Sequence, residues 1–141
     1  MEFTWLSRWQ PQLLAVLRIV TALLFLQHPL VKLFDFPPGV PPGPAPVGSL
    51  FWIAGIVEII AAPLILIGLF TRLAAFLVAG EMAIAYWMVH AKMGFYPIAN
   101  KGEAAILFCF VFLYLAAAGP GAWSVHSALF RSRMSGIERF R

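Results

Sequence analysis

Long apolar runs dominate this sequence and are separated by short polar or proline-rich segments. Four runs are present, at about residues 12–34, 47–70, 72–91 and 103–119. Each is close to the roughly 20 apolar residues that a helix needs to cross the hydrocarbon core of a membrane. A segment in lipid must satisfy its own backbone hydrogen bonds, so each run is predicted to be helical. The pattern therefore predicts an all-α fold, a polytopic membrane protein with an antiparallel four-helix transmembrane bundle.

The links between the runs differ in kind. The first contains six prolines within residues 37–46, which excludes a helix and predicts an extended, polyproline-like chain. The second, at residues 70–72, leaves room only for a tight hairpin. The third, residues 92–101, combines turn residues with aromatic residues, which is typical of a membrane interface. A Gly-Pro-Gly stop follows the fourth run, and a basic tail, residues 120–141, completes what we expect to be a single membrane domain, residues 1–141.

The composition supports a membrane protein and disfavours other classes. Hydrophobic residues make up 62% and charged residues only 11% of the 141 residues. A soluble domain is roughly 45–50% apolar and about 25% charged, so a soluble enzyme, a nucleic-acid-binding protein and a disordered tail are all disfavoured. The formal net charge of +4 is expected to set membrane orientation. The single cysteine, Cys109, allows no disulfide within the chain and is interpreted as a small buried hydrophobic residue.

Lysine and arginine are distributed unevenly between the two sides of the predicted bundle. With four spans, both termini lie on one side, together with the link at residues 70–72. That side carries Arg8, Arg72, Arg131, Arg133, Arg139 and Arg141, and the other side carries Lys32, Lys92 and Lys101. Because basic residues are enriched on the cytoplasmic side, we expect both termini in the cytoplasm.

Three ionisable residues fall well inside the predicted spans: Arg18, Glu58 and Glu81. Each is expected to cost at least ~2.5 kcal/mol at the centre of a helix, so these residues should face one another or a polar interior. At ~100° per residue, the first helix places several polar or aromatic side chains on the face of Arg18. They are Thr21, Phe25, His28 and Lys32.

The pairing of these charges stays open at the level of the sequence. Arg18 is the natural candidate partner of Glu58, because small residues flank Glu58 and a guanidinium binds a carboxylate bidentately. Depth, at ~1.5 Å per residue, places Glu81 nearer to Arg18. Glu81 also points about 180° away from the helix face that carries His90, so one of these two must meet a flanking helix, a partner chain or the interface. The charges form either a neutralised network that fixes helix order or a proton- or redox-linked site near the midplane.

A second polar group is predicted near the outer ends of the helices. It consists of His28, Lys32, His90, Tyr96, Asn100 and Glu103. Polar donors beside aromatic rings suit a quinone headgroup at the membrane edge, so the group is a candidate quinone or ligand site. Alternatively, Glu103 only stabilises the start of the fourth helix through the helix dipole. No metal is expected, because no close ligand pair such as HxxxH occurs, and no motif of the common catalytic classes is present.

Several short motifs resemble those of the DoxX family of small bacterial membrane proteins. They are LRI at residues 17–19, QHPLVKLF at 27–34, GIVE at 55–58, LIGLFTR at 66–72, GEMA at 80–83, NKGE at 100–103 and GPGAWS at 119–124. The resemblance covers about residues 17–124. It departs from the family at Pro29 and Lys101, where glycine is usual, and at His126, where aspartate is common.

The resemblance implies a multi-pass protein of the bacterial inner membrane. Some relatives are linked to quinone-dependent thiosulfate oxidation, or to membrane oxidoreductase complexes in oxidative and thiol stress. Our first hypothesis is therefore a non-catalytic, accessory subunit of such a complex. The alternatives are a small proton-coupled transporter or permease acting through Arg18, Glu58 and Glu81, and a structural assembly factor. Besides the lipid bilayer, the expected partners are redox-enzyme subunits or further copies of the chain, and no nucleic acid.

Overall fold

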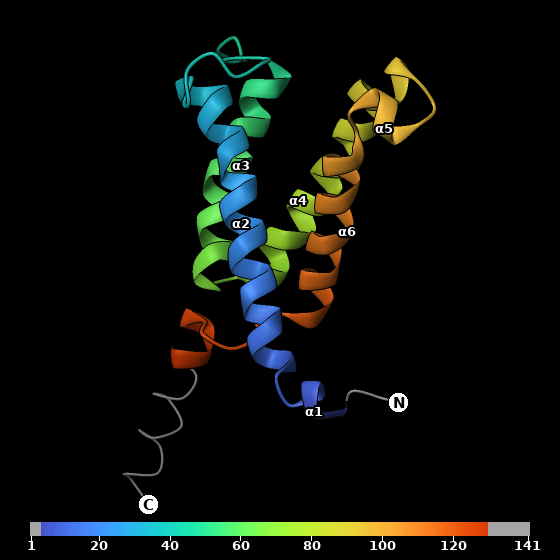
Figure 1. The fold of residues 1–141 in the computed structure, drawn as a ribbon. Coiled ribbons are helices and arrows are strands. Elements are labelled where there is room, and N and C mark those ends of the chain that lie inside the picture. The colour runs from blue at the N-terminus through green and yellow to red at the C-terminus, as the bar shows by residue number, and fades with distance from the viewer. Residues whose placement is uncertain (1–3, 130–141) are drawn as a thin grey trace, which may run out of the picture.

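The computed structural model describes residues 4–129, which form helices and connecting turns (Figure 1). The four long helices are α2 (Gln10–Phe34), α3 (Leu50–Ile67), α4 (Thr71–Ala85) and α6 (Glu103–Ala118), and they run in alternating directions. Two short helices, α1 (Thr4–Ser7) and α5 (Pro97–Asn100), precede α2 and α6. The predicted all-α fold is confirmed. The arginines of the basic tail, Arg131, Arg133, Arg139 and Arg141, lie outside the described residues.

The helices have the length and composition of membrane spans. Three segments, Gln10–Phe34, Leu50–Ile67 and Thr71–Met93, are long and apolar enough to cross a membrane. The fourth, Glu103–Ala118, is apolar but has only 16 residues. At 1.5 Å per residue it extends about 24 Å, against a hydrocarbon core of about 30 Å. By length and composition the chain is a multi-pass membrane protein.

Helix α3 is shorter than the apolar run at residues 47–70 because both of its ends are capped. At its start, Ser49 Oγ accepts a hydrogen bond from the Trp52 N–H at 3.2 Å. At its end, Gly68 adopts a left-handed conformation with φ 74°, and its N–H donates to the Ile65 carbonyl at 3.1 Å. Glycine commonly ends helices in this way because it lacks a Cβ. Since α4 begins at Thr71, the α3–α4 link is the tight hairpin that was predicted.

The third apolar run is not one regular helix. After α4 the chain forms a π-helical turn, Tyr86–His90, and a 3₁₀ turn, Ala91–Met93. A π-helical turn has a wider hydrogen-bond spacing than an α-helix. Residues beyond Ala85 therefore depart from the helical phase that the sequence analysis assumed.

The proline-rich link between α2 and α3 forms successive turns and is not the extended chain that was predicted. Three glycines, Gly39, Gly43 and Gly48, have positive φ angles, which glycine adopts without steric cost. The Ala45 N–H donates to the Lys32 carbonyl at 2.8 Å, so the loop is tied to the end of α2.

The long helices pack as two pairs. Helix α2 packs mainly with α3, and α4 packs mainly with α6; α3 and α4 also touch and join the pairs. Figure 1 shows the two pairs together at the end that carries the chain termini, here called the terminal end. They diverge toward the opposite, distal end, which carries the loops after α2 and before α6. The predicted bundle is thus a pair of diverging arms.

The core lies where the arms meet and is built largely from alanine. Its small members are Ala22, Ala61, Ala62, Ala74, Ala75 and Ala79, and its larger members are Phe25, Ile65, Val78, Met82, Phe112 and Leu115. Small residues allow helix backbones in a membrane to approach closely. Many large apolar side chains on the other faces are exposed, among them Leu24, Phe76 and Phe110, as expected for helices surrounded by lipid.

Candidate functional site

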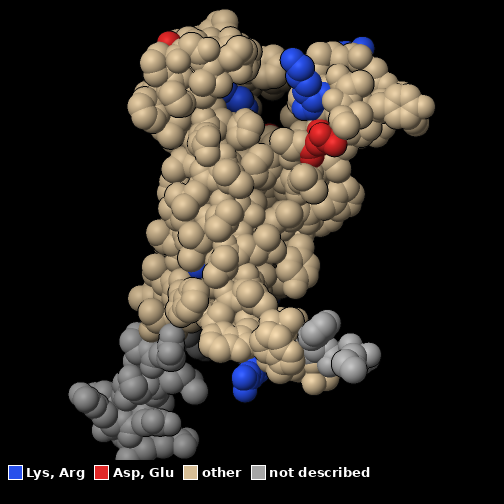
Figure 2. Space-filling model, viewed as in Figure 1, with Lys and Arg blue, Asp and Glu red and all other residues tan. Residues whose placement is uncertain are grey.

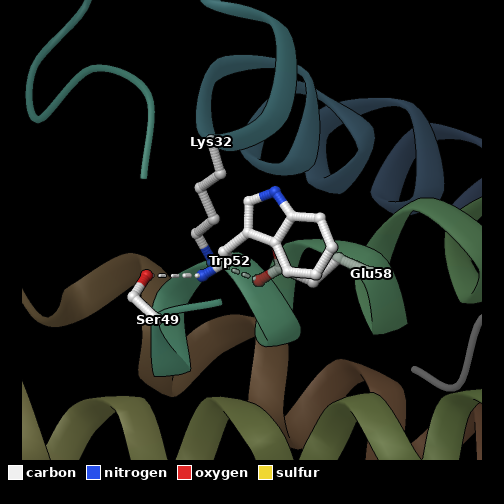
Figure 3. Close-up of polar contacts among 4 residues, drawn as sticks. All are labelled: Lys32, Ser49, Trp52 and Glu58. Atoms are coloured by element: carbon white, nitrogen blue, oxygen red, sulfur yellow. Dashed lines mark hydrogen bonds and ion pairs between the residues drawn. The ribbon is translucent and has the colours of Figure 1, made fainter. Parts of the chain in front are cut away.

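Lys32 and Glu58 form an ion pair between α2 and α3. Lys32 Nζ lies 2.7 Å from Glu58 Oε1. The Glu58 side chain is completely buried, whereas that of Lys32 is 20% exposed. Figure 3 shows Lys32 extending from α2 toward the Glu58 carboxylate, beside the capped first turn of α3. A charge-assisted contact of this length is among the stronger hydrogen bonds, so it joins the two helices of one arm.

Glu81 in α4 lies beside this pair, near enough for its charge to interact with both Glu58 and Lys32. Three buried carboxyl oxygens, Glu58 Oε2 and both oxygens of Glu81, meet no hydrogen-bond partner of good geometry among the described residues. Glu58 lies nine residues before the end of α3 and Glu81 ten residues after the start of α4, which places both about 14–15 Å from the α3–α4 hairpin. We call Lys32, Glu58 and Glu81 the charged triad.

Arg18 is fully buried but belongs to a different part of the molecule. Its Nη1 donates to the carbonyl oxygens of Ile65 and Leu66, both at 3.2 Å. These carbonyls belong to the C-terminal end of α3, where unpaired acceptors and the helix dipole favour a cation. The Arg18–Glu58 pairing suggested by the sequence is therefore not formed, and the proposed group of Arg18, Glu58 and Glu81 is divided.

Arg18 also holds the segment that follows α6 across the terminal end. Its Nη2 donates to the Trp123 carbonyl at 3.0 Å and to the Ala122 carbonyl at 3.4 Å. The Ala122 N–H in turn donates to the Pro11 carbonyl at 3.0 Å. Gly68 packs directly against the guanidinium, because a Cβ at this position would stand 2.1 Å from Nη1. We call the contacts of Arg18 with α3 and with this segment the Arg18 clasp.

The sequence analysis missed a second arginine of the same kind. Arg72 was assigned only to membrane orientation. Its Nη1 donates to the carbonyls of Ala116, at 3.0 Å, and of Ala117, and its Nη2 donates to that of Ala118 at 3.4 Å. Arg72 therefore caps the C-terminal end of α6 from the start of α4. The sequence around Arg72 gives no signal for this role, because the helix that it caps lies more than forty residues further along the chain.

His28 belongs to an aromatic group between the two arms. Its ring lies 5.9 Å from that of Phe25 and 5.5 Å from that of Phe108 in α6. Phe25 also contacts Phe112 at 4.9 Å. His28 lies one helical turn before Lys32, on the same face of α2, and interacts electrostatically with it. The aromatic group is therefore next to the charged triad.

His90 and Asn100 form a separate cluster in the arm of α4 and α6. His90 Nδ1 lies 3.0 Å from the Asn100 carbonyl oxygen. The buried Asn100 side chain donates to the Gly94 carbonyl at 2.8 Å and accepts from the Gly102 N–H at 2.8 Å. Tyr86, which the sequence analysis did not assign to a site, lies 3.5 Å from Asn100 Nδ2. These contacts fix the loop before α6.

The remaining members of the predicted outer group do not join either cluster. Tyr96 is exposed and packs on Phe95, and Glu103 is exposed at the first position of α6. The six predicted residues are thus distributed over five places. Within residues 4–129 no group of three or more histidine, cysteine, aspartate or glutamate side chains is arranged to hold a metal ion.

The molecule is hollowed between the two arms at the distal end. Figure 2 shows this hollow, with basic side chains on both of its flanks and an acidic side chain on one. Phe25, His28, Phe108 and Phe112 join α2 to α6 five to nine residues from the distal ends of these helices, and the arms diverge toward that end. The charged triad therefore lies where the arms begin to diverge.

Comparison with known proteins places these residues in a family. Residues 13–91, more than half of the chain, match the DoxX family. The chain belongs to the DoxX family. This DoxX protein is also 42% identical to an uncharacterized protein of Haemophilus influenzae, over 130 residues that cover 89% of this chain and 97% of that protein. No solved structure matches it. Arg18 and the charged triad lie within the matched residues.

Proposed function

We propose that this DoxX protein is a small proton-coupled transporter in which Glu58 and Glu81 hold the exchangeable proton. The observation that supports this is the Lys32–Glu58 ion pair together with the nearby Glu81 carboxyl group, with three buried carboxyl oxygens that lack a hydrogen-bond partner among the described residues. Lys32 neutralises only one carboxylate. A second carboxylate would leave a net negative charge in an apolar interior, which is costly. One proton held by the carboxyl pair removes this charge.

The position of the triad suits the coupling of proton binding to movement of the two arms. Ionisable groups inside transmembrane helices are characteristic of proton relays and transport pathways. The three residues come from α2, α3 and α4, so they belong to both arms, and a change in the angle between the arms would change their spacing and exposure. The proton would then be held in one arrangement of the arms and released in another.

The accessory redox subunit was the first hypothesis from the sequence; it now takes second place, because it depends mainly on the family resemblance. It placed a quinone headgroup among His28, Lys32, His90, Tyr96, Asn100 and Glu103. Those side chains lie in separate places, so the geometry gives this site no support. The structural assembly factor is the third hypothesis. In that case the triad would serve only to fix the packing of the helices.

Proton binding and movement test the proposal. Infrared difference spectra between alkaline and acidic pH should contain the C=O stretch of a buried protonated carboxyl group in the wild type. The band should be absent in Glu81→Gln or Glu58→Gln. In lipid vesicles without solute, a potassium diffusion potential should drive proton entry through the wild type, because the deprotonated site carries a net negative charge and can return empty across the membrane. Each variant should reduce this proton entry at least tenfold. The pH of the vesicle interior, read with a trapped dye, is the measurement.

Glu103→Gln is the matched control, because Glu103 is an exposed carboxylate at the start of a helix. It should leave both the infrared band and the proton flux unchanged. Wild-type protein with neither signal would contradict the transporter hypothesis. If Glu58→Gln altered only thermal stability or oligomeric state, the assembly-factor hypothesis would take its place.

We also infer that the protein lies in the bacterial inner membrane with both termini in the cytoplasm. The excess of arginine on the terminal side, which includes Arg8 and Arg72, supports this orientation. Reporter fusions test it. An enzyme that is active only in the periplasm should be inactive at the C-terminus and active when inserted at Val40 in the proline-rich loop. The reverse result would overturn the orientation.

A further inference from the structure

We propose that the solute exchanged for the proton is a lipophilic organic cation, bound between the charged triad and the aromatic group. This inference rests on the proposed function and names its substrate class. When the proton leaves the carboxyl pair, Lys32, Glu58 and Glu81 together carry one net negative charge. A monovalent cation restores neutrality in the same place, so the proton and the cation exclude one another.

The oxygens that would receive this cation are already in place. Glu58 Oε2 belongs to a completely buried side chain, and it is unpartnered, as are both oxygens of Glu81. They come from α3 and α4; Glu58 pairs with the ammonium of Lys32 through its other oxygen, and Glu81 interacts electrostatically with both residues. A buried acceptor without a donor carries a desolvation cost that a cationic or N–H-bearing ligand would relieve.

The surroundings favour an organic cation over a metal ion. Hard ions such as Mg²⁺ and Ca²⁺ need six or more oxygen ligands, and only three unpartnered carboxyl oxygens are present here. The adjoining aromatic rings lie at the edge of the core: the half-buried Phe108 is stacked on the buried Phe112 at 5.9 Å and lies 5.3 Å from the buried Phe25. Aromatic faces attract cations and bury apolar substituents. Carboxylates next to aromatic rings therefore suit a cation with apolar groups.

The fold offers this ligand access from one end. At the distal end the arms are separated by the hollow in Figure 2, and the partly exposed Lys32 side chain lies on that side of the triad. At the terminal end, the Arg18 clasp ties α2, α3 and the segment after α6 together. The distal end therefore carries the hollow and the exposed part of Lys32, whereas the terminal end is tied together by the Arg18 clasp.

The pH dependence of binding involves every charged group that faces the site. Helix α2 contributes His28 and Lys32, α3 contributes Glu58, and α4 contributes Glu81, while α6 contributes Phe108 and Phe112 and no charge. Protonation of either carboxyl group removes the negative charge that attracts the cation. Protonation of His28 adds a positive charge beside it. Both effects weaken cation binding as the pH falls.

A pair of probes with equal shape and opposite charge tests the substrate class. Tetraphenylphosphonium and tetraphenylborate have nearly the same size, and equilibrium dialysis measures their binding to the protein in lipid nanodiscs, with empty nanodiscs subtracted. Tetraphenylphosphonium should bind the wild type and should bind Glu81→Gln and Glu58→Gln at least tenfold more weakly. Its affinity for the control Glu103→Gln should equal that for the wild type. Tetraphenylborate binding should not depend on Glu81. Equal binding of both probes, or no effect of the Glu81 and Glu58 variants, overturns the proposal.

Two further measurements separate proton exchange from other effects. In weakly buffered solution, addition of tetraphenylphosphonium to the wild type should release about one proton per bound cation. Binding of the cation without proton release would overturn the proposed exchange. This measurement uses only the wild-type protein. In His28→Gln the weaker binding at low pH should persist; its loss would assign the effect to His28 and also overturn the exchange. If the carboxyl band and proton flux of the wild type are present but the phosphonium does not bind, the proposed transporter stands and this substrate class fails.

Discussion

The guanidinium group of Arg18 rests directly on the backbone of Gly68. The two residues belong to α2 and to the cap of α3, and a Cβ on residue 68 would lie 2.1 Å from Arg18 Nη1 and 2.4 Å from the Ser124 Cβ. Because residue 68 has no side chain, α2, the end of α3 and the segment after α6 can meet at this point. With φ 74°, this glycine both ends α3 and makes room for the arginine that binds the α3 carbonyls.

Replacement of Gly68 by alanine should therefore destabilise the protein strongly. The left-handed conformation costs an L-residue about 1–2 kcal/mol. Displacement of the guanidinium loses hydrogen bonds from a charged donor, each contributing about 1.5–3 kcal/mol. We expect Gly68→Ala to lower the free energy of unfolding by at least ~3 kcal/mol, which thermal unfolding in detergent, followed by circular dichroism, would measure.

Gly48→Ala is the control for this substitution. Gly48 has a similar φ of 81°, but a Cβ there would meet nothing within 4 Å. It should lose only about 1–2 kcal/mol through backbone strain. If the two alanine variants unfolded at the same temperature, the close contact between Gly68 and Arg18 would not contribute to the free energy of unfolding.

Arg18→Lys should separate the α3 cap from the segment after α6. Arg18 reaches both with the two ends of its planar guanidinium, whereas lysine offers a single ammonium point. We expect a loss of about 2–4 kcal/mol, because at least one pair of hydrogen bonds from a charged donor breaks. Faster amide hydrogen exchange at residues 119–124 should accompany it.

Arg72→Lys provides the comparison, since Arg72 also caps a helix but is exposed. It should cost less than about 1 kcal/mol. Equal losses in the two lysine variants would mean that burial adds nothing to the Arg18 contacts.

The helices were predictable from the sequence because their signals are local. Apolar runs act within a few residues, so the bounds of α2 and α6 agree with the predicted runs to within two residues. Helix α3 is three residues shorter than its run at each end, and the third run changes to a π-helical turn at Tyr86. The partners of Arg18 were not predictable. Every residue has a backbone carbonyl oxygen, so the sequence does not show which of them accept hydrogen bonds from Arg18. A carboxylate such as Glu58, by contrast, is an obvious candidate partner for an arginine.

The triad was only half predictable for a related reason. Glu58 and Glu81 stood out as charges in apolar helices, but Lys32 was assigned to the interface by its depth. Its long side chain bridges that difference and reaches Glu58. Helical phase placed Glu81 and His90 on different faces of their helix but did not identify the neighbour of each. Helix α4 packs between α3 and α6 and uses two faces, so Glu81 can face α3 while His90, after a π-helical turn, lies against the loop before α6.

Lys32→Met should leave Glu58 buried without its cation. Removal of one partner of a buried pair typically costs 3–5 kcal/mol. Since Lys32 is partly exposed, we expect about 2 kcal/mol. The double variant Lys32→Met/Glu58→Gln should recover at least half of this loss, because no unpaired charge remains at position 58. A double-mutant cycle from thermal unfolding gives the coupling energy.

Lys92→Met serves as the control, because Lys92 is an exposed lysine near the same end. It should change the stability by less than about 0.5 kcal/mol. A coupling energy of zero in the cycle would contradict the ion pair.

Asn100→Ala should loosen the loop before α6 while leaving the arms intact. The side chain bridges the Gly94 carbonyl and the Gly102 N–H, both at 2.8 Å, and its removal leaves the buried Gly102 N–H unpaired and unties the exposed Gly94. An unsatisfied buried group costs about 1–3 kcal/mol, so we expect a loss of about 2–3 kcal/mol. Amide hydrogen exchange should rise at residues 94–102 and stay unchanged in α2 and α3.

Asn100→Asp and Ile98→Ala sharpen this test. Aspartate can still accept from the Gly102 N–H but cannot donate to the Gly94 carbonyl, so exchange should rise mainly near Gly94. Ile98 is in the same short helix, and its side chain is exposed, so its truncation should leave the exchange of the loop unchanged. If Ile98→Ala and Asn100→Ala raised exchange equally, the loop would depend on general packing in α5 and not on the two hydrogen bonds of Asn100.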